Sequence, residues 1–372
     1  MKILHTSDWH LGITLHNIPL CDQQEHFINT FIETVRTEKP DAVIISGDIF
    51  DTSVSNSEAI RLYNLAVNGV CIGCGVPLII IAGNHDGAAR LASCRELLKK
   101  SGLHITGKLT KDCEPVIIGN AAIYPVPYFN IDEVRYLYPD AEIKTYEDAF
   151  GVVCADIISK ADKSKKNILA AHAFISGAEL SDSNRSAILG TAQMVSADVL
   201  DGFDFAALGH IHRAQSVREN VCYCGSPLKY SVGEAEQEKS MLMLDTDDMS
   251  VRRIPVVPLH ELRVIKGTYD ELVEAAAESD DYIHIEITDI PAGLEMMSLF
   301  RRFYPNLISL RGAEVHDGRA KNLITADEVG EMNEVDILKG FFMEIHGMEL
   351  EDEQIQLFGE AFEAAKKGSG LE

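Results

Sequence analysis

Five short polar motifs, each directly after a short apolar run, restrict the fold of this chain more than any other feature. The motifs are Asp8-Trp9-His10, Gly47-Asp48, Gly83-Asn84-His85-Asp86, Ala171-His172 and Gly209-His210-Ile211-His212. A short apolar run indicates a strand, so each motif would lie where a strand ends. Strands that lie side by side can bring all five motifs to one edge of a sheet. We therefore expect a fold in which scattered segments meet at a single point.

Strand and helix patterns alternate along residues 1–258. Ala42–Ser46 and Leu78–Ala82 are apolar without alternation, which is typical of strands covered on both faces. Gln23–Lys39 and Glu58–Gly69 indicate amphipathic helices between strands. The pattern predicts one α/β (α+β) domain. Its other strands are predicted at Lys2–Thr6, Ala121–Tyr124, Asn167–Ala171, Phe205–Leu208, Val221–Cys224, Ser240–Leu244 and Arg252–Val257.

Residues 259–326 indicate a second, small α/β module. Its predicted strands and helices are Leu262–Lys266, Tyr269–Glu278, Tyr282–Ile287 and Gly293–Phe303.

The segment 327–367 indicates two amphipathic helices with little core of their own. Their apolar faces either pack against this chain or dock in a groove of a partner. The residues on these faces include Leu338, Phe342, Ile345, Phe358 and Phe362. The final stretch, 368–372, is a polar tail or an expression-vector remnant, and we leave it out of the fold argument.

The spacing within two motifs suits metal ligands. In an extended segment, residues i and i+2 point the same way. Asp8 and His10 can therefore reach one metal ion, and His210 and His212 repeat this arrangement with two imidazoles. One such pair alone is weak evidence, but five motifs at strand ends in one domain indicate a site for two metal ions.

The remaining motifs supply further ligands and a proton donor. Asp48 has two carboxylate oxygens and can bridge two ions, while His172 adds an imidazole and Asn84 a neutral oxygen. Successive side chains diverge, so His85 can point at the substrate while Asn84 points at the metal. We expect His85 to protonate the leaving oxygen or to stabilise the transition state. We expect Asp86 to hold the His85 imidazole in the orientation it needs.

The ligand types restrict the metal. Mixed His, Asp and Asn ligands argue against calcium and magnesium, which prefer shells of oxygen alone. They suit manganese, iron or zinc. Two such ions would clamp a phosphoryl group and lower the pKa of a shared water molecule.

The formal net charge of −25 argues against a protein that holds nucleic acid by surface charge alone. Two divalent ions would offset this acidity at the point where a phosphate must lie. A role on nucleic acid would thus need the metal ions, a basic partner, or both.

Nothing in the sequence indicates a membrane segment or a secreted, disulfide-bonded protein. No apolar run approaches the ~20 residues that cross a bilayer, and the chain begins with a strand-like Lys2–His5. The eight cysteines are spread along the chain and indicate reduced thiols. Cys71-Ile-Gly-Cys74 has the spacing of half a zinc site, but no second such pair exists. We expect a cytoplasmic protein with no membrane contact.

Two charged residues just beyond the metal motifs have two interpretations. Asp51 and Arg90 could touch the substrate, or they could be solvated charges on a loop and a helix. The second interpretation is the simpler one.

The ordered motif set resembles that of the calcineurin-like metallophosphoesterases. Four longer segments are similar to segments of the SbcD family, whose members are bacterial nuclease subunits related to the Mre-type repair nucleases. These segments are Thr6-Ser-Asp-Trp-His-Leu-Gly12, Gly47-Asp-Ile-Phe-Asp51, Leu208-Gly-His-Ile-His-Arg213 and Gly225-Ser-Pro-Leu-Lys-Tyr230. One departure is Gly87-Ala88, which follows Asp86 where Ser-Pro or a similar pair is expected.

The resemblance implies a four-layer sandwich of two sheets flanked by helices, followed by a small capping domain and a helical segment. It implies a manganese-dependent DNA phosphodiesterase, with exonuclease action on duplex ends and endonuclease action on single strands or hairpins. Such an enzyme would work with an SbcC-type ATPase in DNA repair, recombination and replication. The ATPase would bind the C-terminal helical segment, and the nuclease domain would form a homodimer.

The resemblance also implies how the ligands divide between the ions. One ion would be held by Asp8, His10, Asp48 and His212, and the other by Asp48, Asn84, His172 and His210. His85 would be the catalytic histidine.

Two other functions remain open from the sequence. The same metal core could serve a phosphatase or phosphodiesterase acting on small molecules or phosphoprotein. The second module and the amphipathic tail favour the nuclease, because a compact phosphatase needs neither. A non-enzymatic scaffold should have lost ligands, and this sequence has lost none.

Overall fold

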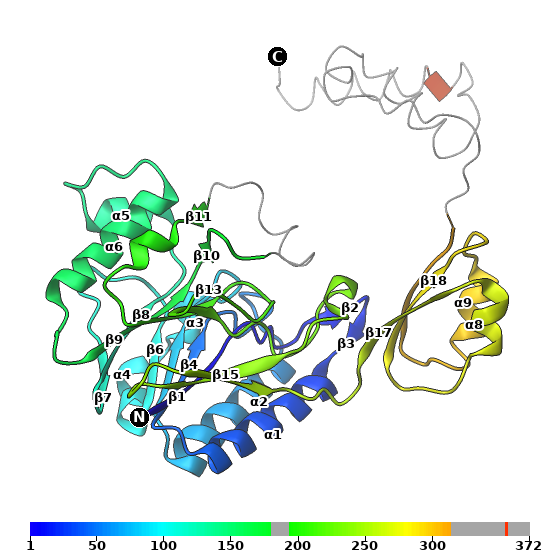
Figure 1. Ribbon diagram of the computed structural model, residues 1–372, viewed down its shortest axis with the longest axis horizontal. Coiled ribbons are helices and arrows are strands. Elements are labelled where there is room, and N and C mark those ends of the chain that lie inside the picture. Colours follow the sequence, from blue (N-terminus) through cyan, green and yellow to red (C-terminus); the bar gives the residue numbers. More distant parts are fainter. Residues whose placement is uncertain (180–192, 314–353, 356–372) are drawn as a thin grey trace. The chain divides into compact units, whose positions relative to one another are not determined.

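The structure is a computed structural model that describes residues 1–179, 193–313 and 354–355 (Figure 1). The chain forms two compact units, Met1–Glu314 and Val315–Glu372. The tail residues Leu338, Phe342, Ile345, Phe358 and Phe362 lie outside the described residues. In the described part, no helix combines the length and the apolar character that a bilayer crossing requires.

The first sheet has six strands in the order β16-β15-β1-β4-β5-β6. Its central strands are parallel, and β15 pairs antiparallel with both β1 and β16. The bounds are β1 (Lys2–Thr6), β4 (Ala42–Ser46), β5 (Leu78–Ile81), β6 (Leu103–Thr106), β15 (Ser240–Asp245) and β16 (Val251–Pro255).

The second sheet also has six strands, in the order β13-β14-β12-β9-β8-β7. Four central strands are parallel, and the edge strands β7 and β13 are antiparallel to their neighbours. The bounds are β7 (Val116–Ile118), β8 (Ala121–Val126), β9 (Lys166–His172), β12 (Phe205–Gly209), β13 (Gln215–Arg218) and β14 (Val221–Tyr223).

The two sheets pack face to face, and the alternation of side chains along β4 shows how. Ala42 and Ile44 belong to a core that also contains Ile168 and Phe205 of the second sheet. Val43 and Ile45 point the other way, into the core beneath the helices. Because both faces of such a strand are covered, its sequence is apolar at successive positions.

Helices cover the outer face of each sheet (Figure 1). The core between the first sheet and α1 (Cys21–Glu38) and α2 (Ser57–Val67) contains Phe27, Phe31 and Leu62. The core between the second sheet and α5 (Ile131–Leu137) and α6 (Tyr146–Lys160) contains Val134 and Phe150. The result is four layers, helix–sheet–sheet–helix, which confirms the predicted fold class.

Helix α1 shows why the sequence pattern succeeds. Phe27, Phe31 and Val35 recur every four positions and are all buried. The helix is followed by the C-cap residue Lys39, which adopts a left-handed φ of 50°, immediately before Pro40. Helix α2 is preceded by the N-cap residue Asn56, whose side chain accepts a hydrogen bond from the Ala59 N–H.

A smaller parallel sheet, in the order β17-β18-β19, follows the two large ones. Its elements are β17 (Leu262–Gly267), α8 (Tyr269–Glu274), β18 (Tyr282–Ile287), α9 (Leu294–Phe300) and β19 (Leu307–Arg311). The predicted strand–helix alternation is present, but α8 ends earlier than residue 278. The proposed domain boundaries at 258 and 326 stay predictions.

Short elements complete the described chain. They are β2 (Thr14–Leu15), β3 (Ile18–Pro19), η1 (Asn68–Cys74), α3 (Ala88–Leu91), α4 (Arg95–Leu98), η2 (Lys99–Ser101), β10 (Phe174–Ile175), β11 (Met194–Val195), η4 (Ala197–Leu200) and η5 (Val232–Glu234). All eight cysteines lie in the described part and are free thiols. In that part, Cys71 and Cys74 belong to no group of three metal-ligand side chains.

Candidate metal centre

The carboxyl ends of five parallel strands from the two sheets bring the sequence motifs together. Strands β1, β4 and β5 of the first sheet lead into the first three motifs. Strand β9 ends at His172, and β12 ends directly before His210. All seven predicted ligands lie in this one place, and they fall into two groups.

The first group consists of Asp8, His10 and His212, whose potential ligand atoms lie within 4.8 Å of one another. The two Nε2 atoms of His10 and His212 are 3.2 Å apart. Asp8 is fixed by Ser7 Oγ, which donates to its Oδ2 at 2.5 Å, and by the His210 backbone N–H, which donates to Oδ1 at 2.9 Å. All three members of the group are buried.

The second group consists of Asp48, His172 and His210. His172 Nε2 lies 3.3 Å from Asp48 Oδ2 and 3.3 Å from His210 Nδ1. Asn84 completes the group, because its Oδ1 lies 3.0 Å from His172 Nε2 and 3.0 Å from His210 Nδ1.

Asp48 stands between the two groups. Its Oδ2 is 3.7 Å from His10 Nε2 in the first group and 3.3 Å from His172 Nε2 in the second. The His85 backbone N–H donates to its Oδ1 at 2.9 Å and fixes the carboxylate. This is the position that a bridging ligand requires.

The backbone at the site adopts conformations that side-chain-bearing residues rarely use. Asp8, His10, Asp48 and His210 have φ angles of 55°, 45°, 51° and 98°. Positive φ is uncommon outside glycine, and such strain persists only where the surrounding structure holds it. Four candidate ligands share this property, so the fold places their side chains at an energetic cost.

Glycines next to the ligands allow close approach within the site, between the two sheets at Gly209 and between neighbouring strand ends of the first sheet at Gly83. A Cβ on Gly209 would lie 1.9 Å from Ser46 O, and one on Gly83 would lie 2.2 Å from Asp48 Oδ1. Side chains at these positions would displace candidate ligands. The glycines of the motifs are therefore part of the cradle around the site.

The arrangement fits two transition-metal ions. Ion–ligand bonds of roughly 2.0–2.2 Å place neighbouring ligand atoms about 3 Å apart, and the groups show separations of 3.0 to 3.7 Å. The outer nitrogens of two imidazoles are already engaged, His172 Nδ1 with Ser46 O at 2.8 Å and His212 Nδ1 with Glu234 Oε1 at 3.1 Å. Both rings therefore present Nε2 inward, as metal-ligating histidines do. The donor set of imidazoles, carboxylates and an amide suits manganese, iron or zinc.

Charge within the groups follows from burial and proximity. Burial lowers the pKa of His10 and of His210 to about 3, so both imidazoles are neutral at neutral pH. Burial would also lower the pKa of His172, but the adjacent Asp48 carboxylate outweighs it and raises that pKa to about 9. Burial would raise the pKa of Asp48, but the attraction of His172 holds it well below its usual range. In the metal-free protein, Asp48 and His172 thus form a buried ion pair.

His85 lies beside the first group, with its ring centroid 4.8 Å from that of His10. Its Nδ1 lies 2.8 Å from the backbone carbonyl of Asp51, so Nδ1–H donates and Nε2 is the basic nitrogen. The expected contact with Asp86 is wrong. The Asp86 carboxylate instead accepts backbone N–H bonds from Gly83, Ile49 and Phe50.

Asp86 therefore ties the loops that carry Asp48 and Asn84 to each other. Three donors converge on one buried carboxyl group because the ends of β4 and β5 lie side by side. Burial raises the pKa of Asp86 to about 6.

Asp51 and Arg90 differ in their distance from the site. Asp51 forms a group with His10 and His85, and its Oδ1 lies 3.7 Å from His10 Nδ1. Arg90 is exposed and donates to the Ser53 carbonyl at 3.0 Å. The structure thus brings Asp51 to the candidate ligands, while Arg90 fastens a neighbouring loop.

Comparison with known proteins agrees with this geometry. The family model of calcineurin-like phosphoesterases matches residues 1–214. The SbcD subunit of the nuclease SbcCD from Staphylococcus saprophyticus is 31% identical over 360 residues, which are 95% of this chain and 96% of that protein. The chain belongs to the SbcD family of calcineurin-like phosphoesterases. As a member, it is a metal-dependent hydrolase.

Other similarities are narrower. A model described as the type 5 capsule protein repressor C-terminal domain matches residues 258–344. Among solved structures, a novel archaeal phosphodiesterase is 15% identical, covers 68% of this chain and 99% of its own, and has a TM-score of 0.33. The protein TT1561 of Thermus thermophilus is 13% identical, covers 69% of this chain and 99% of its own, and has a TM-score of 0.41. Scores this low support no conclusion.

Residues outside the five motifs also contact this SbcD-family site. They include Ser46 and Glu234, already described, and Gln24, Tyr230 and Lys239. Gln24 Nε2 donates to His10 O at 2.8 Å, and Tyr230 Oη donates to Trp9 O at 2.5 Å. Most of these contacts involve backbone carbonyls, which leave no pattern of side-chain types. Only Tyr230 stands in a segment on which the resemblance depends, so the sequence analysis missed the others.

Proposed function

We propose that this chain is a DNA nuclease that uses two divalent ions, with manganese as the expected metal, and works as the nuclease subunit with an SbcC-type ATPase. The observation that carries the proposal is the pair of ligand groups joined by Asp48, with the His85 ring against one of them. Asp8, His10, Asp48 and His212 would hold one ion. Asp48, Asn84, His172 and His210 would hold the other.

When bound, the two ions would clamp a phosphodiester and lower the pKa of a water molecule that attacks phosphorus. His85 supplies the complementary proton. Its Nδ1–H is committed to the Asp51 carbonyl, so its Nε2 is the atom that can hold a proton for the leaving oxygen. The Asp51 carboxylate beside His10 gives the loop a second contact with the site.

The overall charge indicates that this chain does not attract DNA by its own surface charge. With a formal net charge of −25, long-range attraction of DNA is weak. Positive charge would come from the ions at the site and from the partner. We propose that the ATPase binds the segment 327–367 and presents duplex ends for exonuclease action. Single strands and hairpins would be cut by endonuclease action, in DNA repair, recombination and replication. The cytoplasmic location stays a prediction.

We also propose a homodimer formed through the nuclease domain. Val54, Ile60 and Ile72 are exposed apolar side chains on or near α2. Exposed large apolar side chains of this kind are candidates for a protein–protein contact.

The test is a cleavage assay with the purified chain, with and without its cognate ATPase, in Mn²⁺. The substrates are end-labelled linear duplex, a hairpin, a short single strand, and the generic ester bis(p-nitrophenyl) phosphate. The proposal predicts cleavage of single strand and hairpin, and degradation of the duplex end when the ATPase and ATP are present. Hydrolysis of the generic ester with every DNA intact would instead support a phosphatase acting on small molecules or phosphoprotein.

A further inference from the structure

The outer contact of His212 differs from that of the other buried inward-facing imidazole. His212 Nδ1 lies 3.1 Å from Glu234 Oε1, whereas His172 Nδ1 lies 2.8 Å from the neutral carbonyl of Ser46. A carboxylate behind a metal-ligating histidine fixes the tautomer and makes the inner nitrogen more basic. The two groups are thus backed by different chemistry.

Glu234 is itself held by a second buried charge. Its Oε2 lies 2.6 Å from Lys239 Nζ, and the two side chains are 0% and 4% exposed. Lys239 Nζ also donates to Ser226 Oγ at 2.9 Å, to Gln237 Oε1 at 3.0 Å and to His212 O at 3.0 Å. His212 is therefore held at two points: Lys239 contacts its backbone carbonyl, and Glu234 contacts its ring.

Stability alone does not account for this pair. Desolvating two charges is costly, and replacing a buried ion pair by apolar side chains of similar size is often neutral or stabilising. A buried pair that reaches a candidate ligand at two points has a positional role instead. The short helix η5 (Val232–Glu234) places the carboxylate there because the Glu234 N–H donates to Ser231 O at 2.9 Å.

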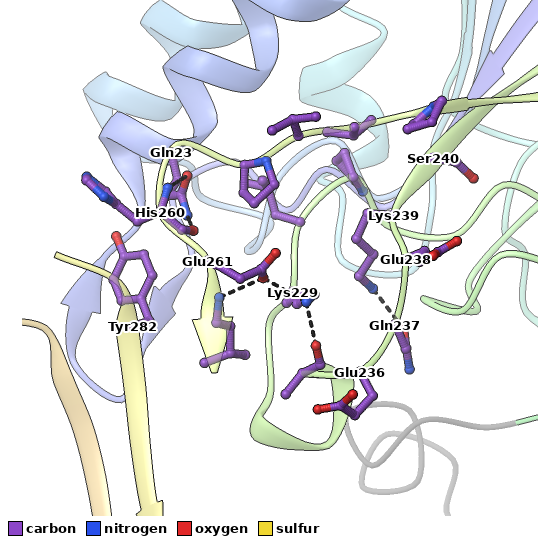
Figure 2. Close-up of a pocket in the computed structure, with 18 of the residues that line it drawn as sticks. Gln23, Lys229, Glu236, Gln237, Glu238, Lys239, Ser240, His260, Glu261 and Tyr282 are labelled. Atoms are coloured by element: carbon purple, nitrogen blue, oxygen red, sulfur yellow. Dashed lines mark hydrogen bonds and ion pairs between the residues drawn. The ribbon is translucent and has the colours of Figure 1, made fainter. Parts of the chain in front are cut away.

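A second ion pair on the same loop provides a comparison. The loop lines a pocket of about 460 Å³, where Lys229 Nζ lies 2.7 Å from Glu261 Oε1 (Figure 2). In Figure 2, Lys229 and Lys239 lie on the same loop, with Lys239 directed at Gln237. The Lys229–Glu261 pair joins the loop to the segment directly before β17 and contacts no candidate ligand among the described residues.

We propose that Glu234 and Lys239 form a positioning pair that fixes His212 for the ion shared with Asp8 and His10. The inference rests on the two-ion assignment proposed above. The pair acts on one ion position, because the outer nitrogen of His172, in the other group, contacts the Ser46 carbonyl instead.

The test measures Mn²⁺ binding to the full chain by calorimetry and by electron paramagnetic resonance. The variant is Glu234→Gln with Lys239→Met, which removes both buried charges together. We expect one Mn²⁺ to bind about 10–100-fold more weakly, while the other binds as in wild type. At a Mn²⁺ concentration that fills both positions in wild type, the wild-type spectrum should be that of a coupled pair, and the variant spectrum should be mainly that of an isolated ion. The metal-free variant should melt close to wild type.

The matched control is Lys229→Met with Glu261→Gln, which removes an ion pair from the same loop and should leave both ions unchanged. A second variant, Glu234→Asp, keeps a charge for Lys239 but shortens the reach to His212 by one methylene group. It should weaken Mn²⁺ binding at the same position to a smaller extent, and it tests the inference if the double variant does not fold.

The outcomes separate the two proposals. Wild-type protein that binds fewer than two Mn²⁺ overturns the two-ion assignment and the inference with it. Two ions in wild type, together with unchanged binding in the folded Glu234 variants, overturn the positioning role alone. Equal weakening of Mn²⁺ binding at both positions also overturns the positioning role, because the pair would then act on the fold and not on His212.

Discussion

Single residues at this site are placed by their neighbours and not by local preference. Asp8, His10, Asp48 and His210 all adopt positive φ, and each follows a strand whose own residues are regular. Left-handed backbone costs about 1–2 kcal/mol for a residue with a side chain. The compensation comes from hydrogen bonds between motifs, such as His210 N–H to Asp8 and His85 N–H to Asp48.

Replacement of His85 by alanine tests the proton-transfer role. The ring contacts the Asp51 carbonyl and is absent from the two groups proposed to hold the ions. His85→Ala should therefore keep two Mn²⁺ and lose about 10²–10⁴ in cleavage rate. Cleavage of a labelled single strand measures the rate, and calorimetry measures the ions. His16→Asn, on an exposed turn, is the control. Normal cleavage by His85→Ala would remove the catalytic role.

The buried pair of Asp48 and His172 predicts how metal binding depends on pH. The pKa of His172 is raised to about 9 in the metal-free protein, after the opposing effect of burial, by the Asp48 carboxylate. A raised pKa stabilises the folded state fully below the unfolded value of about 6.5, and this stabilisation is lost as pH rises through about 9. Metal binding must displace the His172 proton.

Mn²⁺ affinity should therefore rise by about tenfold per pH unit between pH 7 and pH 8.5, with one proton released from His172. Calorimetry in two buffers that differ in ionisation enthalpy counts the protons released. An affinity that is flat across this range, with no proton released, would contradict the ion pair.

Elements differ in how visible they are from the sequence. Strands β1 and β4 match the prediction to the residue, because β4 is an apolar run and β1 contains the short apolar run Ile3-Leu4, each shortly before a polar motif. The apolar run of strand β7, Val116–Ile118, is only three residues long and partly exposed, which is too short to indicate a strand from the sequence. Helix α6 contains Gly151 and adjacent valines, which weaken the helical pattern, yet it is buried against the second sheet. Tertiary packing decides such segments.

Site residues likewise differ in how visible they are from the sequence. The seven candidate ligands could be predicted, because ligand chemistry demands particular side chains at strand ends. The Asp86 contacts could not, since its partners are backbone N–H groups from two loops that meet only in the folded chain. The Glu234–Lys239 pair was missed because its contacts with His212 form only in the folded chain.

Close approach between the ends of β4 and β12 predicts a sharp glycine requirement. A Cβ on Gly209 would meet Ser46 O at 1.9 Å and His172 Nδ1 at 2.9 Å. Gly209→Ala should lower stability by about 1–3 kcal/mol and weaken Mn²⁺ binding. Thermal unfolding in EDTA and Mn²⁺ titration measure the two effects.

Gly151→Ala is the matched control for Gly209→Ala. A Cβ there meets only Val199 Cγ1, at 3.8 Å, an ordinary contact. Alanine within this helix should be neutral or stabilise by roughly 0.5–1 kcal/mol. If the two variants behave alike, the close approach at Gly209 does not hold the site together.

For the whole molecule, the four layers bring the carboxyl ends of strands from both sheets to one place. Ligands separated by up to 204 positions, from Asp8 to His212, share a site because the two sheets pack face to face. The small sheet β17-β18-β19 adds Leu262 and Tyr282 to the core that contains Phe27 and Phe31 of α1. The partner-binding role proposed for the segment 327–367 rests on its sequence alone.

Substitutions that introduce charge at the predicted apolar positions of that segment should abolish partner binding and leave DNA cleavage intact. Phe342→Glu with Phe358→Glu should abolish binding of the SbcC-type ATPase, because a buried unpaired carboxylate is costly. Mn²⁺-dependent cleavage of short single strands should remain. Co-purification with the ATPase measures binding, and Glu344→Gln with Glu360→Gln is the control. Survival of ATPase binding in the first variant would make the segment structural only.

The most direct test of the account is the number of Mn²⁺ ions that the folded, EDTA-stripped chain takes up in equilibrium dialysis. Seven side chains gathered in two groups around Asp48 predict two ions per chain, and Asp48→Ala should reduce uptake at both positions. Elemental analysis gives the ratio. A folded wild-type chain that binds no Mn²⁺, or an Asp48→Ala variant that still binds two ions with unchanged affinity, would contradict it.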